Sequence, residues 1–143
     1  MRIKNRGAIR GFKGLMKGPN QILKLLRGYR AVISKLLMFT EEGMIMFKVK
    51  LDHDRAILAY LLAKALLYGL GILDRFDAAI DELERLPLVD SDRLEGSLER
   101  FSHESELLLL TTDRGYCLNP DKDKIKAIIE NLEDYLAVSG QAI

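Results

Sequence analysis

The sequence predicts a small, mainly α-helical protein with two short β-hairpins. Two observations predict this class. Apolar residues recur three and four positions apart over most of the chain, the spacing of amphipathic helices. Two runs rich in β-compatible side chains are each interrupted by a short turn that contains glycine. The 143 residues, 48% of them apolar, are enough to build one continuous hydrophobic core.

The chain begins with a basic, glycine-rich arm over residues 1–18. Four glycines disfavour a helix here, so we expect an arm that is flexible until it binds a partner. Its cations are Arg2, Lys4, Arg6, Arg10, Lys13 and Lys17. Pro19 and Asn20 then open a basic amphipathic helix over about 20–38, with Lys24, Arg27, Arg30 and Lys35 on its outer surface.

The first hairpin is predicted over residues 36–51, around the turn Glu41-Glu42-Gly43. Met44 and Met46 are also possible internal starts, and a start there would remove the basic arm. The next helix, about 53–69, has Asp52 or Asp54 as its N-cap and is apolar nearly all round.

The apolar stretch 56–73 is about as long as a membrane span, and Lys64 is its only charged residue. A central lysine costs roughly 2.5–3.5 kcal/mol on insertion, and Gly69 and Gly71 end the helix. We therefore expect a buried core helix. The N-terminus lacks the pattern of a secretory signal, and the single cysteine, Cys117, excludes an intramolecular disulfide. A cytoplasmic location is expected.

Two further helices and a second hairpin are predicted next. Asp74 caps a helix to Leu86 that exposes Asp77, Asp81, Glu82 and Glu84, and Pro87 ends it. Asp90 caps a helix over 91–103, which turns Leu94, Leu98 and Phe101 inward. The hairpin covers 107–118 around Asp113-Arg114-Gly115, and a final helix over 122–138 follows Asn119-Pro120.

From residue 53 to about 138, this order of elements resembles the winged helix-turn-helix family of DNA-binding domains. The resemblance implies that helix 91–103 is the recognition helix and that the hairpin is the wing, with Arg114 at its tip. It further implies nucleic-acid contacts from Arg93, Arg100, His103 and Ser97. Small regulators of this type usually dimerise, so we expect a homodimer, with apolar surface from helices 20–38 and 122–138.

Charge divides the chain into a basic segment, 1–50, and a winged-helix-like segment, 51–143. The first has 12 Lys and Arg against two Glu, a net charge of +10, and the second has 10 against 19 acidic residues, a net charge of −9. The predicted recognition helix itself carries Asp92, Glu95 and Glu99, which repel phosphate. Phosphate contacts are therefore expected from the arm.

Three other uses of these charged surfaces remain open. The arm could pack on the acidic part of the chain, or the acidic helical face could serve a protein-interaction adaptor. Alternatively, the basic N-terminal region could lie on an anionic membrane surface, with Leu15, Ile22, Leu25 and Leu26 in the lipid.

No catalytic motif is present, and neither an enzyme activity nor a cofactor is expected. The one candidate metal set is Asp52-His53-Asp54 with His103. The alternative, which we prefer, is that the aspartates cap a helix and that His53 is exposed. Cys117 is expected in the core rather than as a nucleophile. The sequence thus predicts a non-enzymatic DNA-binding protein, a small transcriptional regulator.

Overall fold

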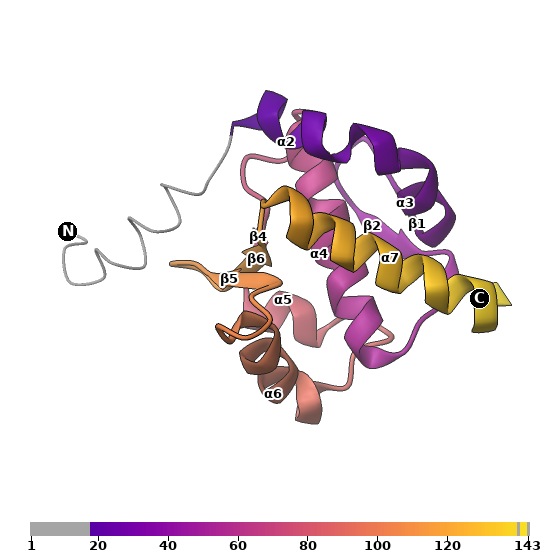
Figure 1. Cartoon of the computed structure of the whole chain (residues 1–143), viewed down its shortest axis with the longest axis vertical. Helices are drawn as coiled ribbons and strands as arrows, with labels where there is room; N and C mark the ends of the chain where they lie inside the picture. The colour runs from indigo at the N-terminus through magenta and orange to yellow at the C-terminus, as the bar shows by residue number, and fades with distance from the viewer. Residues whose placement is uncertain (1–17, 140, 143) are drawn as a thin grey trace.

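The computed structural model describes residues 18–139 and 141–142 and is mainly helical (Figure 1). The helices are α2 (Pro19–Leu26), the 3₁₀ helix η1 (Arg27–Tyr29), α3 (Arg30–Leu36), α4 (His53–Gly69), α5 (Ile80–Glu84), α6 (Ser91–Ser102) and α7 (Lys122–Ser139). The strands are β1 (Leu37–Phe39), β2 (Ile45–Phe47), β3 (Val49–Lys50), β4 (Asp77–Ala78), β5 (Leu109–Thr111), β6 (Tyr116–Leu118) and β7 (Gln141–Ala142).

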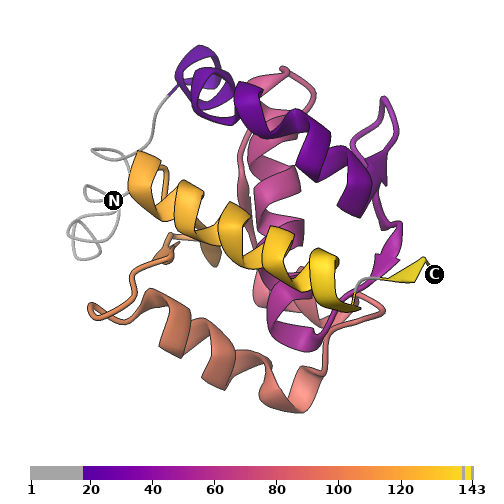
Figure 2. The same cartoon turned by 45° about the vertical axis from the view of Figure 1, so that its right-hand side comes forward.

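Helix α4 is the centre of the molecule. Fourteen of its 17 residues are buried, because apolar side chains surround the whole helix rather than one face. Helices α2 and α3 lie on one side of α4 and α7, and α6 lies on the other (Figures 1 and 2). The prediction of a buried core helix is confirmed. Within the described residues, no helix is long and apolar enough to cross a membrane.

The predicted helix over 20–38 is divided into α2, η1 and α3, with Gly28 in the 3₁₀ turn. Its apolar stripe is used inside the protein, since Ile22, Leu26, Ile33 and Leu36 have no exposed surface. These side chains join the core formed by α4 and α7. The membrane alternative placed Ile22 and Leu26 in the lipid, whereas the structure buries both in the core. Leu25 and Val32 of the same stripe are partly exposed.

The first hairpin is found as β1–β2, in the register Leu37↔Phe47, Met38↔Met46 and Phe39↔Ile45. Its turn contains Gly43 at φ +92°, a conformation that favours glycine. The outward face is rich in methionine: Met38, Met44 and Met46 are 49%, 62% and 42% exposed. The Lys48 ammonium donates a hydrogen bond of 2.7 Å to the Ser34 carbonyl and ties the hairpin to α3.

The predicted helix from Asp74 to Leu86 is wrong in its first half. Strand β4 occupies 77–78, and only the short α5 follows. Asp77, expected on the solvent face, is 5% exposed. The cause is tertiary: β4 pairs with β6 through Asp77↔Cys117 and Ala78↔Tyr116, and the Asp77 carboxylate binds Arg75 and Thr112.

The second hairpin is found as β5–β6, and β4 completes a three-stranded antiparallel sheet in the order β4–β6–β5. Helix α6 precedes this hairpin and has Asp90 as its N-cap, as predicted. Cys117 lies in the core with no exposed surface, which confirms its predicted place. Strand β3 pairs with β7 beyond the end of α7.

Candidate nucleic-acid interface

The described part of the chain carries an exposed basic surface from α2 to β3. We define this basic surface as Lys24, Arg27, Arg30, Lys35, Lys48 and Lys50, all of them exposed. Glu41 and Glu42, in the hairpin turn, are the acidic residues between positions 18 and 50. No cation of the basic surface forms an ion pair within residues 18–139. Their charge is therefore available to an external anion.

The predicted cations of the arm lie outside the described residues. They are Arg2, Lys4, Arg6, Arg10, Lys13 and Lys17. In sequence they directly precede α2, the helix on which the basic surface begins.

Helix α6 presents a mainly acidic face. Asp92, Glu95 and Glu99 are exposed, and so are the predicted contacts Arg93 and Arg100. Arg100 is already engaged, because its Nη2 donates to Asp54 Oδ2 at 2.5 Å and its guanidinium lies 4.8 Å from the Phe101 ring centroid.

The two polar contacts implied for this helix differ in accessibility. Ser97 is 4% exposed, so its predicted contact with nucleic acid is wrong. His103 is exposed, and its Nδ1 lies 3.1 Å from the Ser105 hydroxyl. Of the predicted contacts on α6, Arg93 is the exposed cation without an ion pair among residues 18–139.

Two acidic side chains of α6 influence Tyr116 on β6. Burial, then the charges of Glu99 and Glu95, raise the pKa of Tyr116 on β6. The acidic side chains of α6 thus act on the sheet that contains the hairpin. Helix α6 lies on the opposite side of α4 and α7 from α2 and α3, the helices that carry Lys24, Arg30 and Lys35 (Figure 2).

The hairpin turn is held by hydrogen bonds to Thr112. Its Oγ1 accepts from the backbone N–H groups of Arg114 and Gly115 at 3.2 and 3.0 Å, and its hydroxyl donates to Asp77 Oδ2 at 2.6 Å. Gly115 is required here, because a Cβ at this position would lie 2.1 Å from the Ala78 carbonyl oxygen. The turn therefore holds Arg114 at the exposed tip of the hairpin.

A shallow pocket of about 270 Å³ lies beside this turn and brings Lys64, Glu82 and Arg114 together. Lys64 Nζ donates to Glu82 Oε2 at 2.9 Å, and the Tyr60 hydroxyl donates to the same oxygen. Burial, followed by the hydrogen bond to Glu82, raises the pKa of Tyr60. Lys64 is therefore paired with the Glu82 carboxylate. Arg114, the other cation, is exposed to solvent.

His53 is buried, contrary to the expectation of an exposed residue, and is only 6% exposed. The Asp90 backbone N–H donates to His53 Nδ1 at 2.9 Å. The proton of neutral His53 is therefore on Nε2, which lies 3.0 Å from Ser97 Oγ. Ser97 in turn donates to Asp54 Oδ1 at 2.8 Å.

This His53–Ser97–Asp54 chain does not resemble an activated nucleophile. Here the imidazole donates to the serine hydroxyl, whereas a general base must accept its proton. The chain instead joins the first turn of α4 to α6. His103 is engaged elsewhere, and within residues 18–139 no three His, Cys, Asp or Glu side chains are grouped as metal ligands.

Comparison with known proteins adds no assignment. No protein-family model, no curated protein and no solved structure matches this chain. The function must therefore be inferred from the surfaces described above.

Proposed function

We propose that this protein is a non-enzymatic DNA-binding protein, a small transcriptional regulator that contacts phosphates through its basic N-terminal part. The observation that carries the proposal is the basic surface, with six exposed cations that form no ion pair in residues 18–139. Six more cations precede it in the arm. Neutralisation of DNA phosphates by Lys and Arg releases counterions and supplies much of the affinity of such proteins.

The proposal includes a winged-helix-like architecture over residues 53–138. Its support is the order α4, β4, α5, α6, β5 and β6, in which a hairpin with an exposed arginine directly follows α6. Such a regulator would act in the cytoplasm.

The acidic face of α6 sets the expected mode of contact. Because Asp92, Glu95 and Glu99 repel phosphate and Arg100 is bound to Asp54, we expect little base reading by this helix. Phosphate contacts from the arm and the basic surface, with Arg114 as an additional contact, then supply the affinity.

The proposal is tested with the full chain and a labelled random-sequence duplex, by fluorescence anisotropy over a series of salt concentrations. One variant replaces the six arm cations by Gln, and a second carries Lys24→Gln, Arg27→Gln and Arg30→Gln. The slope of log affinity against log salt concentration should become less steep by about 0.9 for each phosphate contact that is lost. Lys126→Gln, at an exposed position of α7 outside the predicted contacts, is the control and should leave the slope unchanged. Absence of binding by the unmodified chain at low salt would overturn the proposal.

The acidic face of α6 favours a second candidate function, an adaptor that binds a basic partner protein. Its support is the exposure of Asp92, Glu95 and Glu99 on one helix. This candidate predicts that Glu95→Lys with Glu99→Lys abolishes capture of the partner, whereas the arm variant retains it. Duplex binding in the assay above would be absent.

A further inference from the structure

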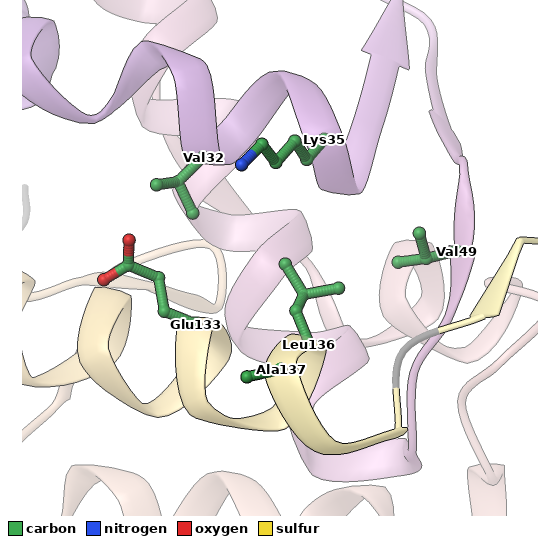
Figure 3. A pocket seen from close by; sticks show the side chains of 6 residues that line it. All are labelled: Val32, Lys35, Val49, Glu133, Leu136 and Ala137. Carbon is green, nitrogen blue, oxygen red and sulfur yellow. The ribbon is translucent and has the colours of Figure 1, made fainter.

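A groove of about 480 Å³ separates α3 from α7. Val32 and Lys35 line it from α3, Val49 from β3, and Glu133, Leu136 and Ala137 from α7. In Figure 3, Val32 points toward α7 and Leu136 points toward α3, so apolar side chains form the interior of the groove. Neither Val32 nor Leu136 is fully buried by the chain itself.

The two walls of the groove carry opposite charges. Lys35 lies on the α3 wall and Glu133 on the α7 wall, and both are exposed. Neither forms an ion pair with another residue in the described part of the chain. A surface with one cation and one anion on opposite walls is complementary to a copy of itself, because a two-fold rotation exchanges the walls.

The last turn of α7 carries exposed apolar surface. Val138 is 86% exposed, the highest value among the large apolar residues of residues 18–138. It follows Ala137, which lines the groove. The rest of the α7 stripe, Ile125, Ile128, Ile129 and Leu132, is buried in the core. The last turn of α7 therefore has exposed apolar surface at Val138, beside the lining residues Leu136 and Ala137.

We propose that this groove binds a second copy of the chain in a two-fold symmetric dimer. The last turn of α7 from each copy packs against the groove of the other, and Lys35 of each copy lies opposite Glu133 of the second copy. Val32 and Leu136 are the partly exposed members of the helical stripes that the sequence offered as dimer surfaces, and the buried members of those stripes take no part. This inference shares Lys35 with the basic surface but uses no residue of the arm, and its test measures dimer dissociation rather than duplex binding.

Charge exchange tests the proposal on the full chain by sedimentation equilibrium. The unmodified chain should be a dimer. Lys35→Glu alone places two carboxylates opposite each other at both symmetric contacts, and Glu133→Lys alone does the same with two ammonium groups. Each single variant should raise the dimer dissociation constant by about tenfold or more, because like charges at an interface repel.

Mixing the two single variants distinguishes a contact between copies from one within a copy. In a mixed dimer, Glu at 35 faces Lys at 133 at both contacts, so equimolar mixing should restore the dimer. An attraction across the groove of one chain would be restored only in the double variant. Lys24→Glu, on α2 outside the groove, is the matched control and should remain dimeric.

The outcomes that overturn the proposal are equally specific. They are a monomeric unmodified chain at every concentration measured, single variants that dimerise normally, and a mixture that stays monomeric. Because Lys35 and Glu133 are both exposed, circular dichroism should show unchanged folding in every variant. A loss of dimer with intact folding, reversed by mixing, is the expected result.

Discussion

The Arg75 guanidinium donates two hydrogen bonds to the Asp77 carboxylate, from Nε to Oδ1 at 2.9 Å and from Nη2 to Oδ2 at 2.7 Å. The Asp77 side chain has no exposed surface, and that of Arg75 is 25% exposed. Arg75 Nη2 also donates to Asp113 at 2.6 Å. With the hydrogen bond from Thr112, this cluster joins β4 to the turn of the second hairpin.

Asp77→Asn should destabilise the protein, because the new amide group presents donors to Arg75. We expect the free energy of unfolding to fall by about 3 kcal/mol. This is the low end for a broken buried ion pair, because Arg75 keeps its ion pair with Asp113. Urea denaturation followed by circular dichroism measures it. Asp113→Asn is the control, since that side chain is 43% exposed and should cost under about 1 kcal/mol. Equal losses would contradict the assignment.

The stabilisation by Asp77 should depend on pH. Burial alone would raise the pKa of this carboxyl, but hydrogen bonds from Arg75 and Thr112 and the charge of Arg75 outweigh it, so the pKa lies below its ordinary value. Such a group stabilises the fold above its unfolded pKa of about 3.9, and the effect is lost as pH falls through the folded pKa.

The difference in unfolding free energy between the unmodified chain and Asp77→Asn should therefore be full at neutral pH and shrink at acidic pH. Urea denaturation of both proteins, from neutral pH to below about pH 3.9, measures this difference. A difference that stays constant over that range would show that the ionised form of Asp77 is not the stabilising species.

Two glycines should respond oppositely to alanine. At Gly115 a Cβ would lie 2.1 Å from the Ala78 carbonyl oxygen, so Gly115→Ala forces β4 and the hairpin apart and should cost about 2 kcal/mol or more. At Gly96, inside α6, a Cβ meets nothing within 4 Å, and Gly96→Ala should stabilise by about 1 kcal/mol through helix propensity. Thermal denaturation distinguishes them, and a stabilising change at Gly115 would refute the close approach.

The buried hydrogen-bond chain at His53 predicts a fixed tautomer. In nitrogen-15 NMR spectra at neutral pH, His53 should show the Nε2–H form, because Nδ1 accepts from the Asp90 backbone. The Nδ1–H form would contradict the structure.

Ser97→Ala should lower the free energy of unfolding by about 1–3 kcal/mol, since it leaves buried polar partners unsatisfied. Chemical denaturation provides the measurement. The control is Ser105→Ala at an exposed position, where we expect almost no change. A similar effect of the two substitutions would exclude a stabilising role for the Ser97 hydroxyl.

Local signals in the sequence were enough to predict most of the helices and both hairpins. The spacing of apolar residues located α4 and α7. Asp90 was recognisable as a cap, and Asp52, the cap of α4, was one of two candidates with Asp54. Strand β4 was not predictable, because two residues at Asp77-Ala78 carry no periodicity and their pairing with β6 joins positions about forty residues apart. His53 was misjudged for the same reason, since its partners Ser97 and Asp90 lie on a distant helix and its cap.

The candidate interface was predictable in part. Charge counts located the basic segment, but the ion pair of Arg100 with Asp54 and the groove between α3 and α7 depend on tertiary packing. Residue type alone could not distinguish Arg93, which is exposed and forms no ion pair among residues 18–139, from Arg100, which is paired with Asp54.

The burial of the cysteine and the exposure of the methionines determine which sulfur atoms in the described part of the protein react with oxidants first. Burial, and then the charge of Asp77, raise the pKa of the Cys117 thiol, which suppresses the reactive thiolate. Met38, Met44 and Met46 are instead open to solvent on the first hairpin. Peroxide would therefore convert this face from apolar thioethers to polar sulfoxides, a change that sulfoxide reductases reverse, before it reached the cysteine in the core.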